Sequence, residues 1–100
     1  MVEPVLEDEF TYPDGCRVVV VAHRVPESEE YPSGIKYRFQ YMDPGGKTLL
    51  RYDNAPHHDA GAHHEHRGED TVNEVSYTSL ADHYQQFRRE VEEIYARRTE

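Results

Sequence analysis

Aromatic and polar side chains alternate strictly between residues 35 and 42. Tyr37, Phe39 and Tyr41 are each separated by a single polar residue. Because successive side chains of a strand point to opposite faces, this pattern predicts a β-strand that buries one face and exposes the other. Such a strand needs neighbouring strands and a cover over its apolar face, so the alternation constrains the fold of the whole chain.

A turn and a returning segment follow this strand. The turn is Asp43-Pro44-Gly45-Gly46, and residues 47–53 then read KTLLRYD. We expect Asp43 to pair with Thr48 across a four-residue loop, since a slip by one residue would mix apolar and polar faces. The resulting pairs are Tyr41–Leu50, Phe39–Tyr52, Gln40–Arg51 and Arg38–Asp53. The polar face is then expected to carry Lys36, Arg38, Gln40, Arg51 and Asp53.

Three other segments have strand character. Residues 8–12 alternate and end at the turn 13–15, and residues 16–25 are rich in β-branched side chains. The apolar run from Val18 to Ala22 indicates a strand near the centre of a sheet, covered on both faces. Residues 71–77 read as a last short strand. The sequence therefore predicts a four- or five-stranded antiparallel meander.

A long amphipathic helix is predicted near the C-terminus. Ser79 is a typical N-cap, with Asp82 at the third helical position. Apolar side chains then follow on one stripe: Leu80, Tyr84, Phe87, Val91, Ile94 and Tyr95. We therefore expect one α+β domain over residues 1–100, made of a sheet meander (8–53), a histidine-rich loop (54–70), the last strand (71–77) and a helix (79–98) on the apolar face of the sheet.

Acidic residues dominate the composition. Twenty Asp and Glu against eleven Lys and Arg give a net charge of −9, and only Lys36 and Lys47 are lysines. The net charge argues against a basic nucleic-acid-binding surface. It is typical either of an ordinary acidic protein or of a salt-adapted, halophilic one, and the scarcity of lysine favours the second. With eight Tyr and no Trp, we expect an aliphatic core with tyrosines at its rim.

The single cysteine and the lack of long apolar segments indicate where in the cell the protein is expected. Cys16 is the single cysteine, so no intrachain disulfide can form, and it is most simply a small apolar residue. No basic and apolar leader is evident at the start, and the longest apolar run is too short to span a bilayer. A cytoplasmic protein that does not enter membranes is expected.

Histidines gather in the segment after the predicted sheet. Five of the seven lie there: His57, His58, His63, His64 and His66. Imidazoles bind divalent transition metals, with Asp53 or Asp59 as an added carboxylate, and an extended His64-x-His66 pair would aim both rings to one side. The spacing matches no strong metal signature, so loop histidines that cap backbone groups or face water are the alternative.

The polar sheet face suggests a second kind of chemistry. Arg38, Arg51 and Asp53 would form a cationic platform for phosphate, with nearby histidines as general acid or base. The alternative is a solvated face with one weak cross-strand ion pair.

Two motifs follow one another in the chain, RYDNAPHH (51–58) and HHEH (63–66). Their sequences resemble motifs of the TumE family, small toxin components of two-gene toxin–antitoxin modules, and the resemblance spans roughly residues 14–91. The family pattern falls on Arg51, Tyr52, Asp53, Asn54, Pro56, His57, His58, His63 or His64, and His66. The chain departs from it at Gly61-Ala62, where the family has a proline, and at Glu65, which replaces a lysine.

The resemblance implies a toxin component that is countered by a cognate antitoxin protein. Together with the polar sheet face and the histidines, it leads us to expect a toxin that acts on RNA. Phosphate would be held by Arg38 and Arg51 together with Asn54. The acid and base candidates are His57, His58, His64 and His66, with Asp53 orienting one of them. No organic cofactor is implied. A non-enzymatic protein-binding module and a small histidine-loop metal-binding protein are the alternatives.

Overall fold

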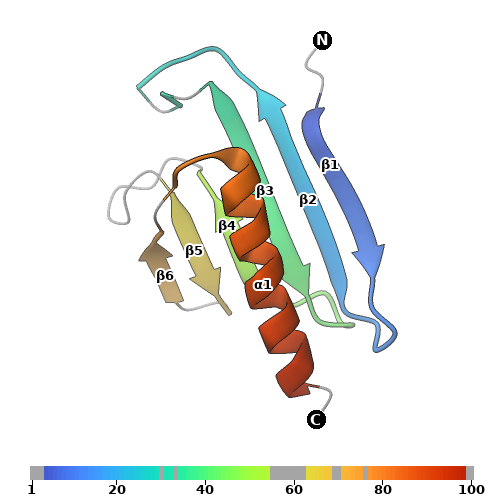
Figure 1. Cartoon of the computed structure of the whole chain (residues 1–100). Coiled ribbons are helices and arrows are strands. Elements are labelled where there is room, and N and C mark those ends of the chain that lie inside the picture. The colour runs from blue at the N-terminus through green and yellow to red at the C-terminus, as the bar shows by residue number, and fades with distance from the viewer. Residues whose placement is uncertain are drawn as a thin grey trace.

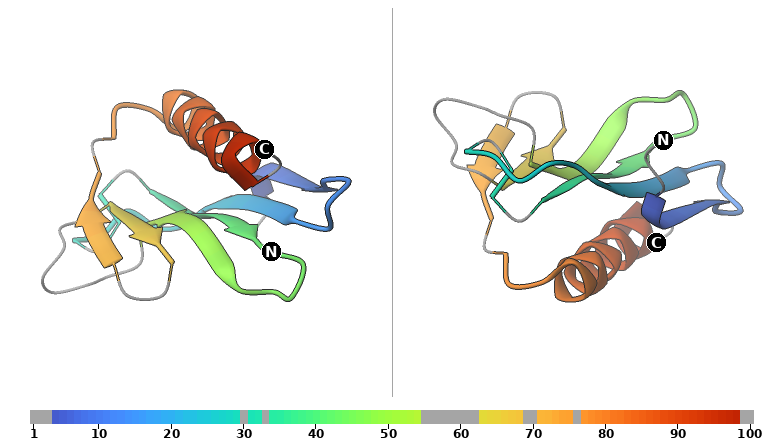
Figure 2. Two further views of the ribbon diagram at one scale, coloured as in Figure 1. Left: turned by 90° about the horizontal axis from the view of Figure 1, so that it is seen from below. Right: turned by 90° about the horizontal axis from the view of Figure 1, so that it is seen from above.

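The elements that follow come from a computed structural model, which describes residues 4–29, 31–32, 34–54, 63–68, 71–75 and 77–98. Within this part the chain forms six strands and one helix: β1 (Pro4–Thr11), β2 (Arg17–Arg24), β3 (Ile35–Met42), β4 (Thr48–Asp53), β5 (His64–Arg67), β6 (Thr71–Glu74) and α1 (Leu80–Arg98). The strands form one antiparallel sheet in the order of the sequence, β1 to β6. Figure 1 shows this meander with α1 lying across it, and Figure 2 shows α1 on one face of the sheet.

The α+β meander with a C-terminal helix is confirmed, but the predicted strand number is wrong, since the described residues form six strands rather than four or five. The added strand is β5, which lies inside the segment 54–70 that we expected to be a loop. Its sequence HEHR has no apolar alternation because both of its faces bear polar side chains. The backbone of β5 nevertheless pairs with β4 and β6.

The predicted register of β3 against β4 is confirmed for all four central pairs, from Tyr41–Leu50 to Arg38–Asp53. Near the turn the prediction is wrong, because Met42 rather than Asp43 pairs with Thr48. The loop has three residues, with the Asp43 amide donating to the Lys47 carbonyl at 2.8 Å. Gly46 has a φ of +92°, the left-handed conformation such loops need. The register shifts between Tyr41 and Met42, which reconciles the pairing near the turn with the four central pairs.

The helix packs as its apolar stripe predicts. Ser79 Oγ accepts from the Asp82 amide at 3.2 Å, which confirms the N-cap. Phe87 and Val91 are fully buried, and Leu80, Tyr84 and Ile94 pack against the core. Burial of this stripe against the sheet is the main source of the helix's stability.

The core is more aromatic than expected. Tyr37, Tyr41 and Tyr52 are almost completely buried together with Phe39, so the prediction of tyrosines at the rim is wrong for these three. On β2, Val18 and Val20 are buried, whereas Val19 and Val21, on the face away from the helix, are only half-buried. The described elements therefore cover one face of the sheet and leave the other, here called the open face, uncovered.

Many of the carboxylates lie at the surface. The exposed ones include Glu7, Glu9, Asp14, Glu27, Glu29, Glu74, Asp82, Glu92 and Glu93. At low ionic strength these like charges repel one another across the folded surface, and at 0.1 M salt the repulsion between charges more than about 10 Å apart is largely screened. We expect the melting temperature to rise between low salt and molar KCl. A melting temperature that stays constant or falls over this range would count against salt adaptation.

Candidate functional site

Sheet pairing brings the predicted polar residues together on the open face. Across β3, β4 and β5, Arg38 pairs with Asp53 and Asp53 with His64. In the next row, Gln40 pairs with Arg51 and Arg51 with His66. Because side chains alternate along each strand, these two rows point to the same side of the sheet, away from α1.

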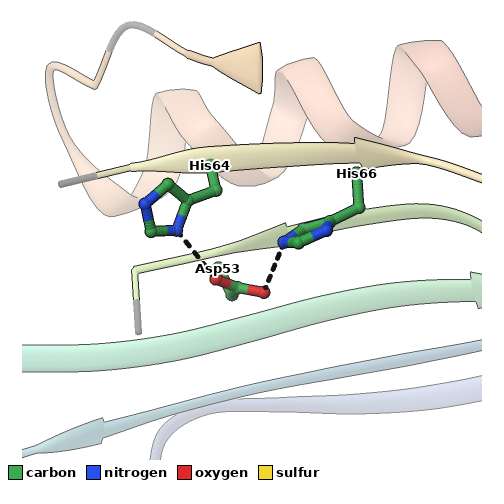
Figure 3. A group of neighbouring side chains, drawn as sticks. All are labelled: Asp53, His64 and His66. Atoms are coloured by element: carbon green, nitrogen blue, oxygen red, sulfur yellow. Dashed lines mark hydrogen bonds and ion pairs between the residues drawn. The ribbon is translucent and has the colours of Figure 1, made fainter. Parts of the chain in front are cut away.

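Asp53 is the centre of this arrangement, and its exposed fraction is only 6%. Its Oδ1 lies 3.2 Å from His64 Nδ1 and its Oδ2 lies 3.3 Å from His66 Nε2. Figure 3 shows both imidazole rings reaching from β5 toward this carboxylate. We call these three residues the Asp53–His64–His66 cluster. Burial of a carboxylate is costly unless donors or a cation surround it, and the cluster satisfies this requirement.

Arg51 adds a positive charge beside the cluster. Its Nε forms an ion pair with Asp53 Oδ2 at 2.8 Å, without the alignment of a hydrogen bond. Its Nη2 lies 3.2 Å from His66 Nε2. That ring nitrogen can either donate an N–H hydrogen bond to Asp53 or accept a hydrogen bond from Arg51 Nη2, depending on the tautomer. Arg51 therefore links the carboxylate to the more accessible of the two histidines.

A cleft of about 450 Å³ opens beside the cluster. The lining of this basic cleft consists of Val21, His23, Lys36, Tyr37, Arg38, Arg51 and Asp53. Lys36 and Arg38 are exposed, so their charges face solvent. A neighbouring hollow is lined by Arg51 and His66. The open face thus carries a local concentration of positive charge on a chain whose net charge is −9.

The other predicted site residues lie elsewhere or outside the described part. Asn54 is buried, and its side chain accepts from the Tyr37 amide at 3.0 Å and donates to the Ile35 carbonyl at 2.7 Å. Its carboxamide therefore holds the start of β3, while a substrate contact of Asn54 remains a prediction. His57 and His58 lie outside the described residues.

His63 lies apart from His64 and His66, on the helix side of the sheet. Its Nδ1 is 2.8 Å from the Tyr37 hydroxyl, which also lies 2.9 Å from His83 Nε2. The His63 ring stacks on Tyr77, with centroids 4.2 Å apart. The sequence therefore supplies two separate histidine groups from one motif, because adjacent residues of an extended segment point to opposite faces.

His83 was missed by the sequence analysis, although it is only 2% exposed. The signal was present, because His83 follows Leu80 by three positions and precedes Phe87 by four, and so belongs to the core-facing stripe. Burial, and then the nearby His63, lower the pKa of His83 to about 4. The imidazole is thus neutral at physiological pH and hydrogen-bonded to Tyr37.

This pKa makes folding stability depend on pH. The unfolded chain binds a proton at His83 near pH 6.5, and the folded chain only near pH 4. Stability from His83 is therefore complete above about pH 6.5 and is lost as the pH falls toward 4, by about 3 kcal/mol in total. Burial and Glu93 raise the pKa of Glu90 to about 7. Protonation of Glu90 therefore increases stability as the pH falls, which opposes the effect of His83.

Urea denaturation at several pH values between 7 and 4 in a Glu90→Gln background separates the two effects. We expect stability to fall with pH in this background, and much less steeply when His83→Leu is added. Equal slopes with and without His83 would contradict the assignment.

Comparison with known proteins places the chain in a family. The fold and the site define a small α+β protein with a basic, histidine-bearing sheet face. The family model described as Toxin TumE matches residues 2–95. The chain therefore belongs to the TumE family, which supports its role as a toxin component and confirms the resemblance of the two motifs. No curated protein matches the chain, and no solved structure does. Among the described residues, no helix is long and apolar enough to cross a membrane.

Proposed function

We propose that the chain is the toxin of a toxin–antitoxin pair and that it binds and cleaves RNA on its open face. The observation that carries this proposal is the basic cleft, which gathers Lys36, Arg38 and Arg51 next to the Asp53–His64–His66 cluster on an otherwise acidic protein. A polyanion such as the phosphate backbone of RNA fits such a cleft better than a neutral or cationic ligand does. Acting on RNA, the toxin would work in the cytoplasm.

The arginines hold the phosphate in this proposal. Guanidinium groups bind phosphate oxygens in a bidentate manner. Arg38 and Arg51 lie diagonally on neighbouring strands, because Arg51 is two residues from Asp53, the pairing partner of Arg38. Arg51 is partly neutralised by Asp53 at 2.8 Å, so Arg38 and Lys36 provide the charge that first attracts RNA. The surrounding carboxylates restrict binding to this patch, since they repel RNA elsewhere.

The histidines supply the proton transfer. His66 is the better candidate for general acid or base, because its side chain is 16% exposed while that of His64 is 1% exposed. Asp53 orients both imidazoles through its two oxygens. His57 and His58 follow Asp53 closely in the chain, and we retain them as further acid or base candidates.

The partner is a cognate antitoxin protein that covers the basic cleft in the inactive pair. A segment rich in carboxylates would compete with RNA for Arg38 and Lys36. If the chain binds such a protein but has no effect on RNA, a non-catalytic protein-binding module becomes the better description.

Binding of a short single-stranded RNA tests the cleft. We expect Lys36→Gln/Arg38→Gln to weaken binding and to reduce its salt dependence by about 0.7 per lost phosphate contact on a logarithmic plot. Both side chains are exposed, so the variant should stay folded. Arg89→Gln, an exposed arginine on the helix, is the matched control. Equal affinities for all three proteins would contradict the proposed cleft.

A further inference from the structure

The donor atoms of Asp53, His64 and His66 lie close enough together to share one ion. One oxygen or nitrogen from each residue falls within 4.8 Å of the others. The contacts from His64 Nδ1 to Asp53 Oδ1 and from His66 Nε2 to Asp53 Oδ2 are 3.2 and 3.3 Å long. In a tetrahedral site with bonds of about 2.0–2.1 Å, neighbouring ligand atoms are about 3.4 Å apart. The contact with the coordinating Asp53 oxygen therefore already has the length of a ligand–ligand edge, while the other ring nitrogen, which contacts the second oxygen, lies within 4.8 Å.

The strands hold these donors in place. His64 and His66 alternate with Glu65 on β5, so both rings point to one side, and Asp53 pairs directly with His64 on β4. His64 and Asp53 are 1% and 6% exposed, which limits their rotation. Sites built on strands are more precise than sites on loops. Metal binding would therefore require little rearrangement of the backbone.

We propose that Asp53, His64 and His66 form a three-ligand site for a divalent transition-metal ion such as Zn²⁺. Two imidazole nitrogens and one carboxylate oxygen suit zinc or iron, whereas Mg²⁺ and Ca²⁺ prefer sets of oxygen ligands. Three protein ligands leave at least one coordination position open. Asp53 also lines the basic cleft, so the proposed site borders the region where phosphate would bind.

The contact of Arg51 with Asp53 is compatible both with a metal site and with a purely hydrogen-bonded carboxylate. Its Nε lies 2.8 Å from Asp53 Oδ2. An incoming ion would take the ring nitrogens and one Asp53 oxygen and leave the other oxygen to Arg51. Without an ion, both imidazoles instead direct N–H groups at Asp53. Direct metal titration separates these descriptions, because only the first predicts tight binding that depends on both histidines.

The experiment uses the full, untagged chain after treatment with a chelator. Zn²⁺ is titrated by calorimetry, and Co²⁺ is titrated by visible absorption, which reports the coordination geometry. We expect one ion per chain for the wild type. His66→Gln and Asp53→Asn should each weaken binding by more than about 100-fold, because losing a ligand exceeds the effect typical of a second-shell partner. His63→Gln is the matched control, since the adjacent His63 lies on the opposite side of the sheet.

Wild-type protein that binds no Zn²⁺, or binding that survives both His66→Gln and Asp53→Asn, would overturn the proposed site. His64 is deeply buried, so the test relies on His66, whose variant should remain folded by circular dichroism. A His57→Ala/His58→Ala variant should retain the ion. Loss of binding in that variant, together with unchanged binding in His66→Gln, would place the ion on other residues and refute the assignment.

The site stands on coordination geometry, and only its part in RNA cleavage rests on the proposed function. With an ion on His66 Nε2, that nitrogen would be a ligand, and His57 or His58 would remain as the acid or base candidates. The metal site and the proposed function can fail separately. Zn²⁺ binding without any action on RNA would refute the proposed function and leave the metal site. RNA cleavage by a chain that binds no metal would refute the metal site and leave the proposed function.

Discussion

Replacing Phe87 by alanine is expected to lower the free energy of unfolding by about 3–5 kcal/mol, a large part of the stability of a domain of this size. Phe87 is fully buried in the centre of α1. Its ring centroid lies 5.5 Å from that of Phe39 and 5.4 Å from that of Tyr52. Removing the ring leaves a cavity between the helix and the sheet, and neighbouring aromatic rings cannot collapse into it without leaving their own strands.

Chemical denaturation followed by circular dichroism measures this effect. Gln85→Ala is the control, because Gln85 is exposed on the same helix and alanine has a higher helix propensity. We expect the control to unfold close to the wild-type midpoint. If Phe87→Ala unfolds there as well, the helix does not contribute to stability through packing on this face.

Replacing His66 or Arg51 by glutamine is expected to reduce RNA cleavage by about 10²- to 10⁴-fold, the range typical of a catalytic acid, base or charge-stabilising group. His66 lies on the accessible side of the cluster, and Arg51 lines both the basic cleft and the hollow next to it. Both side chains project from the open face, away from the core, so their loss should affect chemistry more than folding.

Cleavage of labelled RNA by purified protein and growth of cells expressing the chain without its partner provide two readouts. Wild type and Arg89→Gln should arrest growth, and the two site variants should not, while circular dichroism shows that all are folded. His58→Ala should behave as the site variants do if the segment after β4 takes part. Equal toxicity of all these chains would remove the catalytic assignment, and no toxicity from any of them would favour the protein-binding module.

Short-range periodicity was sufficient to predict the elements that carry the core. The alternation in β3, the turn residues before β4 and the stripe on α1 predicted a sheet covered by one helix, and the structure confirms this arrangement. Cross-strand chemistry predicted the central pairs of β3 and β4 correctly. These features follow from backbone geometry, because side chains repeat every two residues in a strand and every 3.6 in a helix, whatever lies beyond them.

Strand β5 could not be predicted in this way. On one side of β5, His64 and His66 face Asp53. On the other side, Glu65 forms an ion pair with Arg67, whose Nη2 also lies 2.6 Å from Glu90 in α1. A strand whose partners are charged on both faces has no apolar alternation, so its local signal resembles that of a loop.

The candidate site was likewise predicted only in part. The residue types were evident from the sequence, since Arg38, Arg51, Asp53 and the histidines stood out as chemical groups. That His64 and His66 face one side was predicted, with Asp53 or Asp59 as the carboxylate, and the structure joins them to Asp53. The grouping of His63 with Tyr37 and the unpredicted His83 on the other face was not evident. The sequence determined which strands and helix form, because their patterns are local. Only the tertiary structure decided which histidine meets which partner, because β5 presents neighbouring residues to opposite faces of the sheet and the pairing of β4 with β5 sets the contacts.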